Sequence, residues 1–532
     1  MTAGWLAAPA RPGRAGWLAG LAAAVASGVL WILASPPYGV WLLGWLAPWP
    51  VAWAIDQAPT PRRAGLWGGG AALVFTVGGF HWMIYLLEVN AHLPTALAVL
   101  GLALLGGYHG LVFMLGARLT RALRDRRRDD PRGPWPMALC LPLGYLVVEV
   151  VVWTPFPFSV ALGQAAVGPL RHLAAFASSV GIVAIMAAVA GAGYDALTRS
   201  RRRWQPAAGV AAFIVIAVIG SVRVDDDRAP RTITVGLVQP NARVDVPRSS
   251  RELAGHLEQL RRASRELEDR GADLVVWSET AYPFGIARDR TEDVDRAHPL
   301  SIRGTTTGPL LIGAVTVSDD DDRYNSAILV DPDGRFLGRD DKIHRMIGSE
   351  YNPLVERFPA LEKYLPDGAG SYAGGTRPEL LTVTIAGHPV RLAIMVCLED
   401  VIPSFGRELA ALDPDLIVNL TNDTWFDLDA EPHQHEGLAR FRAVEVGVPM
   451  VRAVNTGPSS VIDRDGRIIA RSETRRDGPP TTLLVPVRVG PRARSLYAAV
   501  GGPLTWGAAL AALGWWLGPG VVARVRRRRA RA

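Results

Sequence analysis

The stretch Ile233-Thr-Val-Gly-Leu-Val-Gln239 decides the fold class, because it is an apolar strand pattern at the start of a long region of mixed polarity. A charged amphipathic helix pattern follows over residues 252–268, and a second strand pattern over 272–277. Further strand patterns occupy residues 309–317, 327–330, 390–396 and 416–420. Strands that alternate with helices in this way predict an α/β domain rather than a β-sandwich.

The sequence before this stretch has the composition of a membrane protein. Apolar residues make up 49% of the 532 residues, and nearly all of residues 1–220 form apolar runs separated by short arginine clusters. A helix needs about 20 mainly apolar residues to cross a bilayer. Eight stretches approach this length, namely residues 16–34, 39–55, 64–87, 94–116, 136–153, 173–197, 206–222 and 498–517. The predicted domains are a membrane domain with seven transmembrane helices (1–222), a catalytic domain (223–497), a C-terminal transmembrane helix (498–519) and a basic tail (520–532).

The positions of the positive charges predict the orientation of the chain. Short cytoplasmic loops retain Lys and Arg. With the N-terminus inside, the predicted inner segments hold the arginine clusters, whereas the opposite short loops contain only Arg171. The catalytic domain is therefore expected on the non-cytoplasmic side. This placement also explains the net charge of +7 without a nucleic-acid partner, because no basic face with interleaved aromatic residues is present in the sequence.

Three polar residues stand at the ends of predicted strands, where loops hold catalytic groups on a rigid scaffold. Glu279 and Cys397 each follow an apolar run, and Lys342 lies in Asp340-Asp-Lys-Ile-His344. A thiol attacks as the thiolate, so Glu279 is a candidate base and Lys342 a candidate stabiliser of the thiolate and of an oxyanion.

Each of these residues also has a plainer interpretation. A lone cysteine at a strand end is more often a small buried hydrophobe, and a lone Glu or Lys in a loop is more often solvated. The three residues are far apart in the chain, so their spacing does not show that they meet. The other cysteine, Cys140, lies in an apolar run, and no disulfide framework is predicted.

Several longer motifs surround these residues. They are Trp277-Ser-Glu279-Thr-Ala-Tyr-Pro283, Lys342-Ile-His344 followed by Glu350-Tyr351, Cys397-Leu-Glu399, Asn419-Leu-Thr-Asn422-Asp-Thr-Trp425-Phe426, and the segment from His433-Gln-His435 to Asn455-Thr-Gly457. Together they resemble the apolipoprotein N-acyltransferase family, the membrane-embedded branch of the nitrilase superfamily, and the resemblance extends over essentially the whole chain.

The resemblance implies an αββα sandwich for the soluble domain and a cell inner membrane location, with the catalytic domain on the periplasmic side. It implies that Cys397 takes an acyl chain from a phospholipid as a thioester and passes it to the α-amino group of a diacylglyceryl-cysteine apolipoprotein. Besides Glu279, Lys342 and Cys397, the expected supporting residues are Trp277, Glu350, Tyr351, Glu399, Asn422 and Trp425.

Membrane lipids are expected around the helices, and the chain is expected to act as a monomer without a cofactor or metal. His433, His435 and Glu436 have the residue types of metal ligands, but they are expected to be structural hydrogen bonders near the active site.

The chain departs from the family pattern at three places. Arg345-Met-Ile-Gly-Ser349 replaces the usual residues before Glu350, Leu398 replaces a common tyrosine, and Gly501-Gly502 replaces a Gly-Asp pair. The altered loop bears on substrate access. Two alternatives within enzymes are a membrane-tethered nitrilase-type amidase and an acyltransferase that uses another amine. A transporter with a sensing domain would need polar residues in the spans and internal repeats, and the sequence has little of either.

Overall fold

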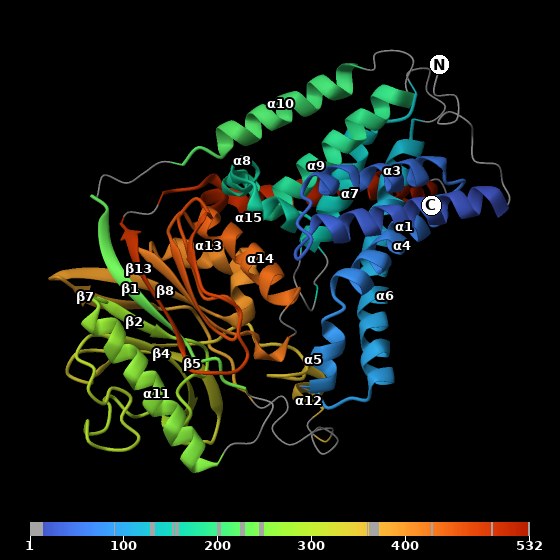
Figure 1. The fold of residues 1–532 in the computed structure, drawn as a ribbon. Coiled ribbons are helices and arrows are strands. Elements are labelled where there is room, and N and C mark those ends of the chain that lie inside the picture. The colour runs from blue at the N-terminus through green and yellow to red at the C-terminus, as the bar shows by residue number, and fades with distance from the viewer. Residues whose placement is uncertain are drawn as a thin grey trace. The chain divides into compact units, whose positions relative to one another are not determined.

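The computed structural model describes residues 14–89, 91–127, 133–151, 154, 159–198, 204–223, 229–243, 249–358, 360, 372–426, 429–490 and 493–529. The chain folds into two compact units, one made of Met1–Ile84, Thr95–Val222 and Ala499–Ala532, the other of Tyr85–Pro94 and Arg223–Ala498 (Figure 1). Parts of the sequence predictions lie outside the described residues, namely Arg11, Arg128, residues 199–203, the end of the fifth predicted span at 152–153 and residues 530–532 of the basic tail.

The first unit is helical, as the apolar runs predict. Its helices are α1 (Arg14–Ala34), α2 (Leu42–Leu46), α3 (Pro48–Gln57), α4 (Pro61–Gly79), α6 (Thr95–Asp125), α7 (Met137–Val151), η1 (Leu162–Ala166), α8 (Gly168–His172), α9 (Ala174–Thr198), α10 (Trp204–Gly220) and most of α15 (Leu496–Arg529); α5 (Met83–Val89) passes from this unit into the second.

Four helices are long and apolar enough to cross a membrane on their own: Gly16–Ala34, Thr95–Asp125, Ala174–Thr198 and Leu496–Trp515. The pair α4 and α5, bent by 56°, is a fifth candidate, and Met137–Val150 and Pro206–Gly220 are shorter apolar helices. The unit is thus a membrane domain, but within the described residues three of the eight predicted spans are interrupted: the second, the third, and the sixth, where Ala177 and Ser178 of α9 have non-helical backbone angles.

The second predicted span, 39–55, is divided into α2 and α3, which begins at Pro48. Proline has no N–H to donate and fits best at the first turn of a helix, so a helix starts there instead of continuing. The third predicted span, 64–87, breaks between α4 and α5.

Small residues let the helices of the membrane domain approach closely. A Cβ added at Gly69 of α4 would lie 2.6 Å from the carbonyl oxygen of Gly110 in α6. Close backbone packing of this kind is a main source of helix association in lipid. A buried ion cluster joins further helices, because Arg124 of α6 donates to Asp56 of α3 at 2.8 Å and the Tyr194 hydroxyl of α9 donates to the same carboxylate at 2.6 Å.

The second unit contains two sheets. The first has the strand order β13 (Thr481–Val489), β1 (Arg231–Gln239), β2 (Leu274–Trp277), β4 (Leu310–Val317), β5 (Arg323–Val330), β6 (Phe336–Asp341), with β3 (Ile286–Ala287) beside β4. The second has the order β12 (Ile468–Arg471), β11 (Ser460–Ile462), β10 (Met450–Asn455), β9 (Leu416–Asn422), β8 (His388–Val396), β7 (Leu380–Ile385). In each sheet three neighbouring strands are parallel, β1, β2 and β4 in one and β8, β9 and β10 in the other.

Helices cover the outer face of each sheet. Apolar side chains of both sheets form one core between them. The outer face of the first sheet packs against α11 (Ser250–Asp269), and that of the second against α13 (Pro403–Ala411) and α14 (Glu431–Val446) (Figure 1). The remaining short helices are α12 (Pro353–Arg357), η3 (Cys397–Val401) and η4 (Asp423–Trp425). The predicted αββα sandwich is confirmed.

Residues 85–94 belong to this unit, although the predicted spans 64–87 and 94–116 include residues 85–87 and 94. The Arg476 guanidinium lies 4.7 Å from the centre of the Tyr85 ring, a cation–π distance. Arg476 also donates to the carbonyl oxygen of Phe426 at 2.6 Å. Tyr85 of α5 thus contacts the sandwich close to η4.

Candidate active site

Cys397 stands at the turn between β8 and η3. Its φ is +53°, a left-handed conformation that non-glycine residues adopt rarely and that tends to persist at functional sites. Asn419 of β9 stabilises the turn by donating to the carbonyl oxygens of Met395 and Cys397, both at 3.3 Å. The thiol is 6% exposed. The strand and the turn therefore present a buried sulfur at the carboxyl end of a parallel strand.

Glu279 follows β2, the corresponding strand of the other sheet. Its backbone passes directly over Gly313 of β4, where a Cβ would lie only 2.3 Å from the carbonyl oxygen of Ser278. The Oε1 atom of Glu279 accepts from the Asn325 amide at 2.6 Å. Among the described residues, the buried Oε2 atom has no hydrogen-bond partner. One oxygen of this carboxylate is thus held and the other is available to receive a proton.

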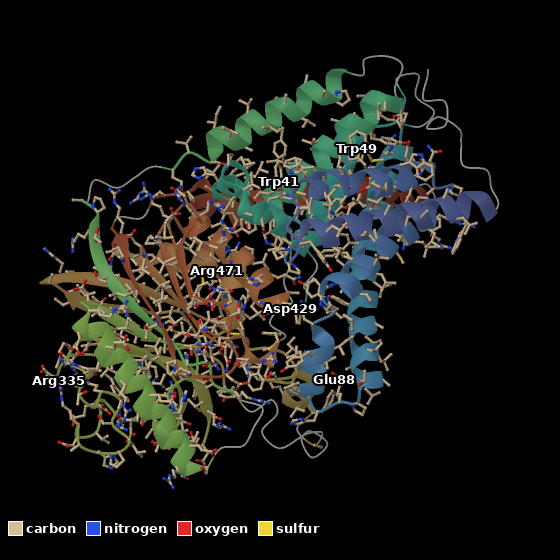
Figure 2. The ribbon with its side chains drawn as sticks, in the orientation of Figure 1. Trp41, Trp49, Glu88, Arg335, Asp429 and Arg471 are labelled. Carbon is tan, nitrogen blue, oxygen red and sulfur yellow. The ribbon has the colours of Figure 1, made fainter. Side chains whose placement is uncertain are left out.

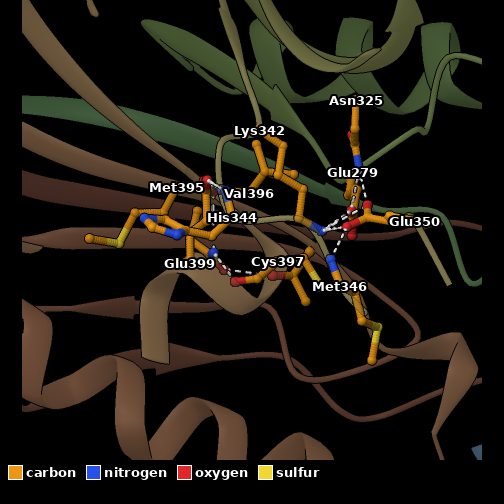
Figure 3. Close-up of polar contacts among 12 residues, drawn as sticks. Glu279, Asn325, Lys342, His344, Met346, Glu350, Met395, Val396, Cys397 and Glu399 are labelled. Carbon is orange, nitrogen blue, oxygen red and sulfur yellow. Dashed lines mark hydrogen bonds and ion pairs between the residues drawn. The ribbon is translucent and has the colours of Figure 1, made fainter. Parts of the chain in front are cut away.

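Lys342 follows β6 and is bound by two carboxylates. Its Nζ lies 2.8 Å from Oε2 of Glu350 and 3.4 Å from Oε1 of Glu279. Asn325 of β5 joins both acids, since its amide also donates to Glu350 at 3.1 Å. Figure 3 shows the side chains of Glu279, Lys342 and Cys397 converging, with Glu350 beyond the lysine. The structure therefore brings these four predicted residues together.

The charges of this cluster follow from burial and pairing. Burial lowers the pKa of Lys342, but Glu350 and Glu279 outweigh burial and hold that pKa well above its usual range. Burial raises the pKa of Glu350, but Lys342 outweighs it and the pKa falls below its usual value. Lys342 and Glu350 are thus a charged pair.

The Cys397 thiol and the Glu279 carboxylate respond differently. Burial raises the pKa of the Cys397 thiol well above its usual value, and the negative charge of Glu279 adds to this effect. Burial also raises the pKa of Glu279, against the opposing charge of Lys342. The resting sulfur is therefore a thiol, and Glu279 is a stronger base than an exposed glutamate.

Glu399 joins the two loops that carry Lys342 and Cys397. Its Oε1 accepts from the backbone N–H groups of Ile343 at 2.7 Å and His344 at 2.9 Å, while Oε2 accepts from Val396 N–H at 2.7 Å (Figure 3). Burial raises the pKa of Glu399 to about 7, against these hydrogen bonds. Its carboxylate fixes the distance between the lysine loop and the nucleophile turn.

Asn325 is the residue that the sequence analysis missed. It is a polar residue near the start of β5, whose other residues from 327 to 330 are apolar. A buried polar group needs a partner, so an asparagine in this position was the available signal. Without the fold, its partners could not be named.

Trp277 lies apart from the cluster. Its indole N–H donates to Ser264 of α11 at 2.8 Å, and its ring packs in the outer core beneath that helix. Trp277 therefore stabilises the attachment of α11 rather than contacting the thiol. Trp425 is half-buried at the end of η4.

Asn422 lines a pocket that reaches Glu279. The pocket has a volume of about 450 Å³, and its lining includes Ser278, Glu279, Arg323, Asn422 and Asn455. Asn455 donates to the Asn422 side chain at 3.0 Å. This polar cavity provides space for a substrate beside the proposed base.

Residues 27–192 match the family described as the N-terminal domain of apolipoprotein N-acyltransferase, and residues 234–489 match the carbon-nitrogen hydrolase family. An apolipoprotein N-acyltransferase of Rhodopseudomonas palustris is 30% identical over 522 residues, which cover 91% of this chain and 92% of that protein. This chain belongs to the apolipoprotein N-acyltransferase family.

Another family member, from Geobacter metallireducens, is 29% identical over 501 residues, with 91% and 92% of the two chains covered. Among solved structures, an amidase from Nesterenkonia sp. AN1 is similar at 20% identity, with a TM-score of 0.37, over 50% of this chain and 92% of that one. The family membership expected from the motifs is confirmed.

Arg345 anchors the altered loop, residues 345–349, in which this chain departs from the family pattern. The guanidinium donates to the carbonyl oxygen of Tyr372 at 2.7 Å, pairs with Glu356 at 3.0 Å and lies 4.5 Å from the centre of the Tyr351 ring. Tyr351 thus contacts the altered loop. Leu398 is half-buried, and Gly501-Gly502 lie within α15.

A second buried cluster of this acyltransferase-family chain lies behind the nucleophile turn. It consists of Asp400, Asp423, Glu431, His435 and Arg452. Ligand atoms of Asp423, Glu431 and His435 lie within 4.8 Å of one another, close enough for a cation.

His433, His435 and Glu436, which have the residue types of metal ligands, do not gather at one site in the structure. His435 alone faces the buried cluster, while His433 contacts Arg471, and Glu436 pairs with the same arginine at 3.5 Å.

Proposed function

We propose that this protein transfers an acyl chain from a phospholipid to the N-terminal α-amino group of diacylglyceryl-cysteine apolipoproteins, through a thioester at Cys397. The observation that carries the proposal is the buried Glu279 oxygen without a hydrogen-bond partner among the described residues, next to a lysine held as a cation and a buried thiol. Family membership supplies the reaction class.

In the first half-reaction, the Cys397 S–H proton moves to Glu279 and the sulfur attacks the ester carbonyl of the phospholipid. Negative charge develops on the carbonyl oxygen, and Lys342 stabilises it in a site with little water, where such an interaction is strong. The ester C–O bond then breaks, and Glu279 returns the proton to the leaving oxygen. The products are the acyl thioester and a lysophospholipid.

In the second half-reaction, the acceptor amine attacks the thioester carbonyl. Glu279 takes the proton from the amine and returns it to sulfur as the C–S bond breaks, so the free thiol is restored. Because Glu279 and Lys342 serve both half-reactions, the same residues act on both substrates in turn. Exclusion of water from the site favours the amine over hydrolysis.

Both substrates are anchored in lipid, which is consistent with a catalytic domain attached to membrane helices. We propose that the chain resides in the cell inner membrane with residues 223–497 on the periplasmic side, as a monomer without a cofactor.

Asp319 is exposed on a loop of the sandwich. In a background in which both native cysteines are replaced (Cys140→Ala and Cys397→Ala), an Asp319→Cys variant should react with a membrane-impermeant maleimide in intact spheroplasts; labelling only after lysis would reverse the orientation.

The reaction is tested with purified full-length protein and a phospholipid labelled in its acyl chain. The label should appear on the peptide that contains Cys397 and should then move to a diacylglyceryl-cysteine peptide when that acceptor is added. Cys140→Ala is the matched control and should retain labelling, whereas Cys397→Ala should lose it. A thioester that decays only to free fatty acid would favour the amidase, and transfer only to other amines would favour the other acyltransferase.

A further inference from the structure

The buried charge cluster behind Cys397 has no part in the proton transfers described above. Asp400 is in η3, three residues after the nucleophile, and Asp423 is the first residue of η4. His435 comes from α14 and reaches both turns. Asp400 and Asp423 are fully buried, and His435 is 4% exposed.

Both ring nitrogens of His435 face carboxylates. Nε2 lies 2.7 Å from Oδ1 of Asp400, and Nδ1 lies 3.2 Å from Oδ1 of Asp423 and 3.6 Å from Oε1 of Glu431. Ionised carboxylates only accept hydrogen bonds, so both ring nitrogens donate and the imidazole is a cation. Burial lowers the pKa of His435, but Asp400 and Asp423 outweigh it and raise that pKa well above its usual range.

The remaining members of the cluster complete its charge balance. Arg452 donates through Nε to Oδ2 of Asp400 at 3.1 Å. Burial raises the pKa of Glu431 well above its usual value, and the charge of Asp423 adds to the effect, which favours the neutral form of Glu431. The cations His435 and Arg452 therefore balance the carboxylates of Asp400 and Asp423.

The contacts of His435 connect the turn that carries Cys397 with the turn that follows Asn422. The η3 turn carries Cys397, and the η4 turn is preceded by Asn422, which lines the pocket next to Glu279. Burial is the main cause of the raised pKa of Cys397, and the charge of Asp423 adds to it after the charges of Glu279 and Glu350. A cation on His435 offsets that charge while it holds the two turns together.

We propose that His435 is a positioning residue that acts through Asp400 and Asp423. It fixes the nucleophile turn against the pocket wall, and its charge favours the thiolate by balancing Asp423. This inference rests on the proposed function, because it assigns His435 to the step in which Cys397 becomes acylated.

The experiment uses the full-length Cys140→Ala protein, in which Cys397 is the single thiol. The rate of Cys397 alkylation by iodoacetamide is measured as a function of pH, and thioester formation is measured with labelled phospholipid. His435→Gln keeps a polar side chain but loses the cation. His433→Gln is the matched control, because His433 lies two residues away on the same helix and contacts Arg471, which Figure 2 labels, instead of the cluster.

The expected result is a shift of the His435→Gln alkylation profile to higher pH. Thioester formation should fall by up to about 100-fold, the cost of misplacing a reacting group by about 1 Å, with a KM for phospholipid within about threefold of the parent. The control should match the parent. A double variant, His435→Gln with Asp423→Asn, removes the uncompensated charge, and its profile should return toward the parent.

Three outcomes would overturn the proposal. His435→Gln could equal the control in both assays, the double variant could fail to recover the profile, or bound metal could be found whose removal by a chelator reproduces the His435→Gln defect. If His435→Gln does not fold, Asp423→Asn alone should shift the alkylation profile to lower pH, and no shift would refute the charge effect. Failure of the proposed function would give another result: Cys397 of the parent would be alkylated normally, but the parent would transfer no acyl chain.

Discussion

Gly313 is the position where the smallest change should disturb the proposed base most. In Gly313→Ala the new Cβ would lie 2.3 Å from the carbonyl oxygen of Ser278, 2.7 Å from the N of Thr280 and 2.8 Å from the Cα of Glu279. All three are backbone atoms, so no side chain can rotate away. Ordinary contact begins near 3.4 Å, and the segment that carries Glu279 must therefore move by about 1 Å.

The expected size of the effect follows from this displacement. Overpacking of a tight core costs about 1–3 kcal/mol of unfolding free energy. A misplacement of about 1 Å at a reacting group costs on the order of 100-fold in rate. We therefore expect thioester formation at Cys397 to fall by about two orders of magnitude in Gly313→Ala, with a clear drop in thermal midpoint.

The assay is single-turnover labelling of Cys397 by acyl-labelled phospholipid, with thermal unfolding measured on the same sample. Gly255→Ala is the control, because Gly255 lies within α11 and a Cβ there meets open space. That variant should keep full activity and be slightly more stable, since alanine favours a helix over glycine. A Gly313→Ala protein that labels within threefold of the parent would refute the packing argument and the placement of Glu279.

Alanine changes at Glu279, Lys342 or Cys397 should each abolish thioester formation to a similar extent. The triple variant should be no worse than a single variant, because groups that act as a unit do not have additive effects. A Lys342→Ala enzyme with near-parent turnover would contradict the assignment of Lys342 as the oxyanion stabiliser. Glu399 has its pKa raised from 4.5 to about 7, so its contribution to stability is greatest below about pH 4.5 and declines as pH rises to about 7. Thermal midpoints compared across that range should show this decline in the parent and a shallower decline in Glu399→Gln, because other buried acids such as Asp340, whose burial raises its pKa to about 8, still contribute. Trp277→Phe should lower the unfolding free energy by about 1 kcal/mol through one lost hydrogen bond, while turnover stays within threefold of the parent. If a stable Trp277→Phe protein lost turnover, the indole would have a direct role in the reaction.

The alternation of strand and helix patterns after Ile233 was enough to predict an α/β domain, because periodicity follows local geometry. The eight apolar stretches predicted helices well but not their continuity. Whether 39–55 forms one helix depends on Pro48 and on neighbouring helices, and the structure has two short helices there. Hydropathy averages over such a break and therefore does not detect it.

The candidate site shows the same division. Motifs identified Glu279, Lys342 and Cys397, and the resemblance added Glu350 and Glu399. The roles of the last two depend on contacts across the fold: Glu350 pairs with Lys342, and Glu399 binds three backbone N–H groups from two separate loops. Trp277 occurs in the same motif as Glu279 but points to the outer core beneath α11. Glu279 lies beyond the end of β2, in the turn that follows, so the alternation of the strand does not fix its direction.

By itself, the sequence determined that this chain combines membrane helices with an α/β domain, that it resembles a family with a cysteine nucleophile, and which residues carry the family motifs. Only the tertiary structure decided that Asn325 joins the two acids, that Gly313 must lack a side chain, and that His435 faces Asp400 and Asp423. The reason is physical. Composition and periodicity express local preferences of the chain, whereas burial, pairing and charge balance arise only when strands distant in sequence are brought side by side.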